Sequence, residues 1–329
     1  MIRKSQVRQI FICTSMAFAA AVCSNASMAA DNYPSKPIRI LVGASAGGGT
    51  DILARMFADK FNQELKQPVV VENRPGASQT IAADNTARAP ADGYTLLAAT
   101  NTNQAIAPHL LKLSYDPLKD INAVGLIAKV PHVLVVGKNS PFKSVKDVVA
   151  AMKANPGQLT FGSSGIGSTQ HIAGEAFNLA VGGKATHIPY KGSSQAHIDI
   201  ISGEVSMMFD TSSSSMAQIR SGGLRALAVL APKRSSQLPD VPTLAESGIN
   251  GADMYTWYGL FVTGGTDPKV IDLLNKTLNK TLEMPDVRER LLGLGGEITP
   301  ISAAETAKMN REEFERFGKL IKEANLQAQ

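Results

Sequence analysis

The sequence predicts an α/β fold in two lobes, each built on a mainly parallel sheet flanked by helices. Short runs rich in β-branched residues alternate with helical segments along the chain, as expected for sheets covered on both faces. The chain has 329 residues, of which 44% are hydrophobic and 5% aromatic, and this length suits two cores better than one. Capping-box patterns at residues 144–147 and 302–305 mark two helix starts.

The expected strands are short apolar runs bounded by Gly, Pro or polar residues. They follow along the chain at residues 38–42, 69–71, 95–99, 160–162, 187–188, 205–209 and 225–230. Pro268 and Pro285 stand where the first turn of a helix accepts a proline. Helices are therefore expected to begin at both prolines.

Two further apolar runs, residues 130–136 and 255–262, are interpreted as hinge strands that cross between the lobes. If both cross, the chain between them is an insertion that forms one lobe by itself. The predicted first lobe is then discontinuous, 30–131 plus 256–329, and the predicted second lobe is 132–255.

The N-terminus has the pattern of a secretory leader. Its charged region holds three basic residues, Arg3, Lys4 and Arg8. An apolar run follows at residues 10–22, and small residues occupy the positions before a cleavage site at Ala29. We expect residues 1–29 to be a signal peptide cleaved after Ala29, which places the mature protein in the periplasm.

Removal of this leader changes the composition of the protein. Cys13 and Cys23 both lie in the leader, so the mature chain is predicted to have no disulfide and no thiolate metal site. Loss of three basic residues from 33, against 28 acidic residues, leaves a net charge of +2. This near-neutral balance argues against a nucleic-acid partner. The sequence predicts no cofactor, no metal and no catalytic residue.

A glycine-rich turn directly follows the first expected strand. A turn between a strand and a helix directs free backbone N–H groups to one point, where the helix dipole adds partial positive charge. Such a point binds anions. Three consecutive glycines also lose more backbone entropy than a simple turn requires. The predicted anion-binding residues here are Ser45, Gly47, Gly48, Gly49 and Thr50.

Polar loops follow other expected strands. Ligands of open α/β sheets lie beyond the carboxyl ends of the strands, so these loops are candidate binding segments. The candidates are Thr100, Asn101, Thr102, Ser163, Ser164, Gly167, Ser168, Thr169 and Tyr190. The alternative for the hydroxyl residues is that they cap a helix.

Seven motifs along the mature chain, taken in order, resemble the Bug family of extracytoplasmic solute-binding receptors related to the tripartite tricarboxylate transporter. They are YPSKPIR at 33–39, AGGGTD at 46–51, VVENRPGA at 70–77, ADGYTL at 91–96, FGSSGIGSTQH at 161–171, PYKG at 189–192 and LPDVPTL at 238–244.

This resemblance implies a type II-like periplasmic-binding-protein fold and a monomer. It further implies that a small carboxylate is captured in the interlobe cleft by backbone amides and hydroxyls. Its expected partners are the subunits of a tripartite tricarboxylate-type membrane transporter. An alternative is a periplasmic sensory adaptor that binds the same class of ligand and then a signalling protein.

Asp210 ends the expected strand at 205–209 and is a candidate ligand-binding residue of a different kind. A carboxylate in the cleft disfavours a second ligand carboxylate and favours an amine or a hydroxyl. We therefore expect Asp210 to help select a carboxylate that bears a donor group. The alternative is that it caps the turn at 211–215.

A serine hydrolase is the rival interpretation, because residues 43–47 match the G-x-S-x-G pattern with Ser45 as nucleophile. That fold places several strands before the nucleophile, and this chain has only a short segment there. The candidate bases are His109, His132, His171, His187 and His197, and no spacing distinguishes one of them.

Overall fold

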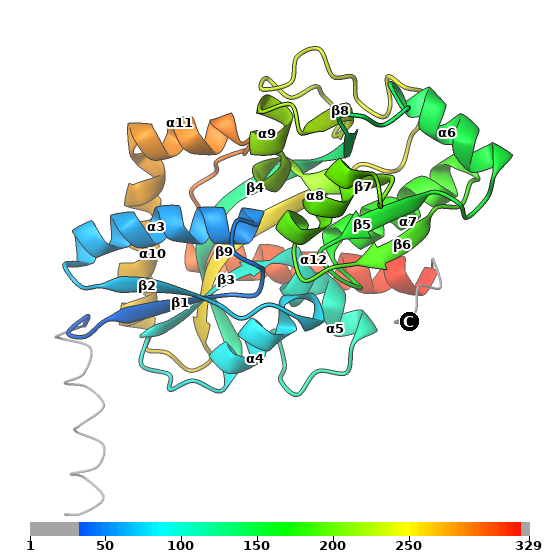
Figure 1. Cartoon of the computed structure of the whole chain (residues 1–329). Helices are drawn as coiled ribbons and strands as arrows, with labels where there is room; N and C mark the ends of the chain where they lie inside the picture. Colours follow the sequence, from blue (N-terminus) through cyan, green and yellow to red (C-terminus); the bar gives the residue numbers. More distant parts are fainter. Residues whose placement is uncertain (1–32, 324–329) are drawn as a thin grey trace, which may run out of the picture.

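The computed structural model describes residues 33–323, which form two α/β lobes side by side (Figure 1). The predicted fold class is confirmed. The predicted signal peptide, residues 1–29, and its cleavage site after Ala29 lie outside the described residues. Within the described range, no helix is long and apolar enough to cross a membrane.

The first lobe is a sheet with helices on both faces. β1 (Ile38–Val42) pairs in parallel with β2 (Val69–Asn73) and β3 (Thr95–Thr100). β9 (Tyr255–Thr263) pairs antiparallel with β3 and with the first part of β4 (Ile121–Gly137). Because side chains alternate along a strand, β1 supplies apolar residues to two cores, one on each face. The helices are α3 (Gly49–Leu65), α4 (Thr80–Ala87), α10 (Pro268–Glu283) and α11 (Pro285–Gly293).

The second lobe repeats this plan. β5 (Thr160–Ser163) pairs in parallel with β6 (Thr186–Pro189) and β7 (Met207–Thr211). β7 and β8 (Leu224–Leu230) both pair antiparallel with the second part of β4. The helices are α6 (Val145–Ala154), α7 (Thr169–Val181), α8 (Ser193–Ser202) and α9 (Ser212–Arg220). Short helical segments elsewhere are η1 (Ala77–Gln79), η2 (Thr102–Ile106) and α5 (Ala107–Leu110).

The expected helix starts are confirmed. Ser144 accepts a hydrogen bond from the Asp147 N–H, while the Asp147 carboxylate accepts one from the Ser144 N–H. α12 (Ala303–Glu323) begins with the same reciprocal pair between Ser302 and Glu305. Reciprocal caps satisfy N–H groups that a helix terminus otherwise leaves unpaired.

Each sheet is mainly parallel, as expected, and contains one reversed strand, β9 in the first sheet and β4 in the second. β4 and β9 run antiparallel to their neighbours, and these are the strands at which the chain passes between lobes. β4 pairs with β9 as far as Pro131 and with β7 and β8 from His132 onward. β9 pairs within the first sheet, and the return crossing lies just before it, where the His132 N–H donates to the Met254 carbonyl at 3.0 Å. The lobe boundaries stay a prediction.

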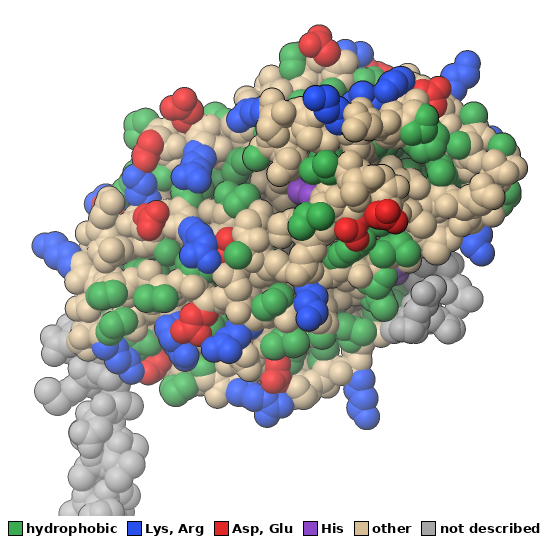
Figure 2. All heavy atoms as spheres, in the orientation of Figure 1, with side chains coloured by type: hydrophobic (Ala, Val, Ile, Leu, Met, Phe, Trp, Pro, Cys, Tyr) green, Lys and Arg blue, Asp and Glu red, His purple; other side chains and the backbone are tan. Residues whose placement is uncertain are grey.

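The C-terminal helix α12 contributes to both lobes. Phe317 and Ile321 pack into the apolar cluster that contains Phe161 and Phe209 of the second lobe. Near the helix start, the Asn275 side chain on α10 donates to the Ile301 carbonyl. On the face seen in Figure 2, basic and acidic side chains are interspersed rather than gathered by sign.

Candidate functional site

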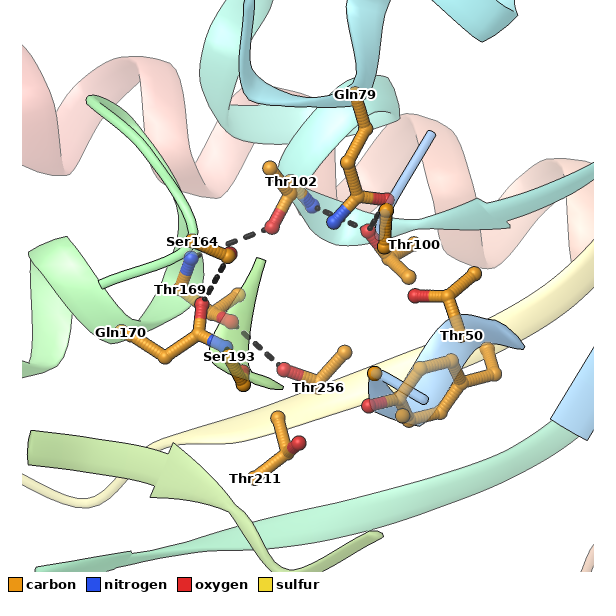
Figure 3. A pocket seen from close by; sticks show the side chains of 14 residues that line it. Thr50, Gln79, Thr100, Thr102, Ser164, Thr169, Gln170, Ser193, Thr211 and Thr256 are labelled. Atoms are coloured by element: carbon orange, nitrogen blue, oxygen red, sulfur yellow. Dashed lines mark hydrogen bonds between the residues drawn. The ribbon is translucent and has the colours of Figure 1, made fainter. Parts of the chain in front are cut away.

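A cavity of about 20 Å³ lies between the lobes, and its lining is mostly polar and uncharged (Figure 3). Among the residues that the structure describes, no Lys, Arg, Asp, Glu or His lines it. In the closed arrangement this space is enough for about one water molecule. The lining residues are Ala44, Gly48, Gly49, Thr50, Gln79, Thr100, Thr102, Ser164, Thr169, Gln170, Ser193, Thr211, Thr256 and Tyr258.

Five α-helices begin at this cavity, two from the first lobe and three from the second. The lining includes the first residues of α3, α7 and α8, and the residues before α4 and α9, respectively Gly49, Thr169, Ser193, Gln79 and Thr211. The N-caps of α3, α8 and α9 make no side-chain capping bond. Converging helix N-termini create positive potential without a cationic side chain, and the first-turn N–H groups can donate to an anion.

The two lobes touch around the cavity. The Ser194 hydroxyl donates to the Ala46 carbonyl at 3.1 Å, and the Thr169 N–H donates to Thr102 Oγ1 at 3.3 Å. The Ser78 hydroxyl donates to the carbonyl of Ile166 on the opposite lobe. The arrangement is therefore a closed one, in which protein groups from both lobes surround the cavity.

Gly48, Gly49 and Thr50 of the predicted glycine turn line the cavity, whereas Ser45 and Gly47 do not. A Cβ on Gly49 would lie 2.5 Å from the Ser213 hydroxyl of the opposite lobe. Gly47 has a φ of +78°, and its N–H donates to the Asp51 carboxylate at 2.9 Å. Glycine is thus required at Gly49 for close approach and favoured at Gly47 for backbone conformation.

Asp51 fixes the glycine turn from behind. Its carboxylate accepts hydrogen bonds from Arg55 and from Asn73, which also donates to the Ala44 carbonyl. Burial acts to raise the pKa of Asp51, but bonds from Arg55, Gly47 and Asn73 outweigh it and hold the pKa below its ordinary value. The ionised carboxylate therefore orders the turn at neutral pH.

Gln79 lines the cavity and was missed by the sequence analysis. It ends a run of three non-glycine residues with positive φ, Ala77 at 43°, Ser78 at 54° and Gln79 at 69°. Such conformations cost about 1–3 kcal/mol each and cluster at functional sites. A Cβ on Gly43 would lie 2.4 Å from the Gln79 Cβ, so the absence of a side chain at Gly43 allows this segment to pack closely against it.

Ser164 and Thr169 line the cavity, and the neighbouring predicted residues support them instead. Ser163 shares hydrogen bonds with Gly165 and lies 2.6 Å from the His187 ring. The other two supporting residues are Gly167, whose N–H donates to His171 Nδ1, and Ser168, whose hydroxyl accepts from the His171 N–H. Ser168 thus has the capping role that was the alternative.

Thr100 and Thr102 also line the cavity, but Asn101, Tyr190 and Asp210 do not. The Asn101 amide donates to the Tyr255 carbonyl at 3.0 Å, and the Tyr190 hydroxyl donates to Asp199 at 2.5 Å. Asp210 is completely buried. Protein donors occupy its carboxylate, which explains why Asp210 does not line the cavity.

Seven lining residues were absent from the sequence prediction. Ser193 and Thr211 begin helices after predicted strands, so the rule that selected Thr169 could also have found them. Gln170 follows Thr169 directly. The remaining four, Ala44, Gln79, Thr256 and Tyr258, carry no local signal of this kind.

The residues expected for a serine hydrolase are not assembled around Ser45. Among the described residues, the Ser45 hydroxyl has no hydrogen-bond partner, and no histidine lines the cavity. His132 and His197 contact Thr256 and Asp210 respectively. Within the same range, no group of three His, Cys, Asp or Glu residues is placed to hold a metal ion.

His132, where β4 changes sheets, gives an expected pH dependence of stability. Burial lowers the pKa of His132 from 6.5 to about 4. Below about pH 6.5, His132 is therefore protonated in the unfolded chain but stays neutral in the folded chain until the pH approaches 4. Stability from this group is complete above about pH 6.5 and falls as the pH drops towards 4, by about 2 kcal/mol at pH 5.

Urea unfolding at pH 7.5, 6 and 5 measures this effect. We expect the free energy of unfolding to fall over the series, and His132→Gln to make the fall shallower by about 2 kcal/mol between pH 7.5 and 5. An identical pH slope in wild type and variant would contradict the assignment.

Comparison with known proteins yields matches over most of the chain. A family model described as tripartite tricarboxylate transporter family receptor matches residues 53–326. Protein BugT of Bordetella pertussis is 37% identical over 302 residues, which cover 91% of this chain and 92% of BugT.

Two solved structures have closely similar folds. The periplasmic binding protein BugD matches with a TM-score of 0.86 and 33% identity, over 90% of this chain and 100% of BugD. An R. palustris protein solved with adipate matches with a TM-score of 0.87 and 32% identity, over 91% of this chain and 100% of that protein.

Proposed function

The chain belongs to the tripartite tricarboxylate transporter family of receptors, and we propose that it captures a small carboxylate between its lobes for uptake by a membrane transporter of that type. The proposal places the mature protein in the periplasm, after cleavage of the leader at Ala29. It assigns no catalytic step and no cofactor to the chain. The adipate bound to the R. palustris relative supports the choice of ligand class.

The observation that carries this proposal is the convergence of five helix N-termini on a cavity lined by uncharged residues. Micromolar binding requires about −8 kcal/mol. Each charge-assisted hydrogen bond contributes roughly 1.5–3 kcal/mol. A few oriented N–H groups around one carboxylate can therefore supply this affinity after the cost of association, and no arginine is required.

Lobe closure completes the proposed site. The lobes are taken as residues 30–131 with 256–329 and residues 132–255, which rotate about the crossings near His132 and Met254. Contacts such as Ser194 to Ala46 form on closure and exclude water. Exclusion of water strengthens the electrostatic attraction between the N–H groups and the carboxylate.

A thermal-shift screen of the purified mature protein against a library of carboxylates tests the proposal. We expect at least one acid to raise the melting temperature and to bind with micromolar or tighter affinity in calorimetry. NMR spectra of the ligand should be unchanged after prolonged incubation. Failure of every acid to bind, or conversion of the bound acid that Ser45→Ala abolishes, would overturn the proposal.

Uptake of the identified acid by cells distinguishes transport from sensing. A strain without the receptor should lose high-affinity uptake. Normal uptake together with a lost transcriptional response would contradict the transport role.

A further inference from the structure

Asp210 is a buried carboxylate whose four acceptor positions are all occupied. One oxygen accepts from the Ser193 hydroxyl at 2.8 Å and from the Gln170 amide at 3.3 Å. The other accepts from His197 Nε2 at 2.7 Å and from the Ser214 hydroxyl at 2.5 Å. Burial acts to raise the pKa of Asp210, but bonds led by that from His197 hold the pKa below its ordinary value. An ionised carboxylate only accepts, so all four partners donate.

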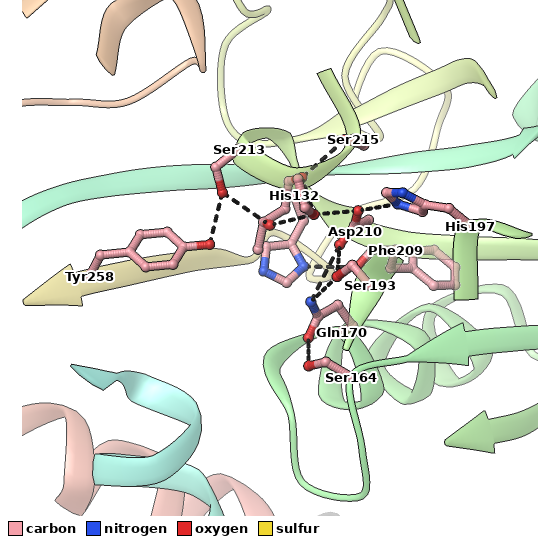
Figure 4. Close-up of polar contacts among 12 residues, drawn as sticks. His132, Ser164, Gln170, Ser193, His197, Phe209, Asp210, Ser213, Ser215 and Tyr258 are labelled. Carbon is pink, nitrogen blue, oxygen red and sulfur yellow. Dashed lines mark hydrogen bonds and ion pairs between the residues drawn. The ribbon is translucent and has the colours of Figure 1, made fainter. Parts of the chain in front are cut away.

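Because Ser214 donates its proton to Asp210, the donor and the acceptor are fixed in each contact along a chain of hydroxyls (Figure 4). Ser214 Oγ lies 3.0 Å from Thr211 Oγ1, and since Ser214 has no second proton, Thr211 donates. Ser213 then donates to Thr211 at 3.2 Å, and Tyr258 donates to Ser213 at 2.8 Å. Every proton in this chain is directed towards Asp210.

Gln170 extends the order to Ser164. Its Nε2 donates to both Asp210 and Ser193, which fixes the orientation of the amide. Its Oε1 is then the acceptor for the Ser164 hydroxyl at 2.8 Å. The Ser164 proton therefore also points into the protein.

His132 orders a second chain that ends at Thr169. The Nδ1 of His132 lies 3.0 Å from the Phe209 carbonyl, which only accepts, so Nδ1 carries the proton. The Nε2 of the neutral ring accepts from the Thr256 hydroxyl at 2.8 Å. Thr256 then accepts from the Thr169 hydroxyl at 2.7 Å.

Six hydroxyls of these chains line the cavity and have given their protons to protein acceptors. They are Ser164, Thr169, Ser193, Thr211, Thr256 and Tyr258. Each oxygen can offer the cavity a lone pair but no proton. These side-chain oxygens, which we call the acceptor wall, attract a hydrogen-bond donor, whereas the backbone N–H groups at the same helix starts donate.

Two side chains next to Thr100, those of Gln79 and Thr102, have the reverse polarity. Gln79 Oε1 accepts from the Thr100 hydroxyl, so its Nε2 is the end that carries hydrogens for a ligand. Thr102 Oγ1 accepts from the Thr169 N–H and keeps its own proton. The Gln79 amide and the Thr102 hydroxyl therefore form a donor side suited to a carboxylate.

We infer that the ligand is a carboxylate that also carries a hydroxyl or ammonium donor, with the carboxylate on the donor side and the donor on the acceptor wall. This inference rests on the proposed function and narrows its ligand class. Asp210 acts as a positioning residue, because it selects the donor through Ser193 and the ordered hydroxyls rather than by touching the ligand.

Calorimetry with acids of matched length tests the preference. The series are succinate, malate and aspartate, then glutarate, 2-hydroxyglutarate and glutamate, then propionate, lactate and alanine. In the series that binds most tightly, we expect a hydroxy or amino acid to bind at least tenfold more tightly than the unsubstituted acid. Equal or tighter binding of the unsubstituted acid overturns this inference and leaves the proposed function standing. No binding by any of these acids or by a wider carboxylate library overturns both.

Two variants locate the source of the preference. In Asp210→Asn the amide can donate to Ser193, so we expect the preference to fall below threefold. Ser193→Ala, which keeps Asp210, should weaken the donor-bearing acid five- to twentyfold and the unsubstituted acid less than threefold. Circular dichroism and thermal unfolding verify that both variants are folded.

Ser194→Ala is the matched control, because Ser194 adjoins Ser193 but bonds across the lobes to Ala46. It should weaken both acids by the same factor and leave the preference unchanged. If Ser193→Ala behaves in the same way, the role of Ser193 is structural and the inference is wrong.

Discussion

Replacing Gly49 with alanine is expected to weaken ligand binding by roughly tenfold to a hundredfold with little loss of secondary structure. The new Cβ would lie 2.5 Å from the Ser213 hydroxyl, 2.8 Å from the Tyr258 hydroxyl and 3.3 Å from the Thr211 hydroxyl. Ser213 and Thr211 belong to the opposite lobe, so the methyl group holds the lobes apart. Overpacking of this kind costs about 1–3 kcal/mol, which corresponds to the expected loss of affinity.

Calorimetry measures the affinity, and small-angle scattering measures the compaction on ligand addition that Gly49→Ala should reduce. Gly48→Ala is the control, because Gly48 has an ordinary φ of −76° and its Cβ would approach Ser45 O at 3.2 Å. We expect it to reduce affinity less than threefold. Equal losses in the two variants would show that closure against Ser213 is not the cause.

The part of the site that the sequence predicted follows a local rule. Gly48, Thr50, Thr100, Thr102 and Thr169 lie just after strands or at helix starts, where neighbours in the chain decide the position. The alternation of strands and helices can be predicted from a single sequence, and so can the residue that caps each helix. These residues could therefore be assigned without knowledge of the tertiary fold.

Asp210 shows where a local rule fails. It is the next-to-last residue of β7, one before Thr211, and its side chain lies inside the second lobe, whereas Thr100 at the end of β3 lines the cavity. Donors from α7, α8 and α9 determine that direction, and their meeting is a tertiary event. The sequence analysis expected the Asp210 charge to select a ligand that carries a donor group. That this selection acts through Ser193 could be inferred only from the hydrogen bonds in the structure.

The mixed character of the sheets was hidden for a related reason. β4 contains Gly125 and Pro131 and has irregular register at two places against β9, so it does not read as one long strand. The sequence analysis recognised its second half and interpreted it as a crossing. Strand direction depends on partners far away in the chain, which periodicity alone does not identify.

Gly43→Ala is expected to have the largest effect on stability. Its Cβ would lie 2.4 Å from the Gln79 Cβ, 2.6 Å from the Gln79 Cα and 2.8 Å from the Gln79 carbonyl oxygen. A flexible side chain could move away, but this backbone is held in left-handed conformations by contacts such as that of Ser78 with Ile166. We expect a loss of about 3 kcal/mol, or roughly 6–12 °C in melting temperature.

The same substitution should displace the Gln79 amide and weaken ligand binding more than tenfold. Gln79→Ala separates the two effects, because it removes the amide without a clash and should weaken binding with a small change in melting temperature. Gly293→Ala is the stability control, since its Cβ would meet nothing closer than 4.0 Å, and it should melt within about 2 °C of wild type. If Gly43→Ala and Gly293→Ala have the same melting temperature, the backbone around Gln79 can move at little cost in free energy. The strained backbone would then not be what positions the Gln79 amide.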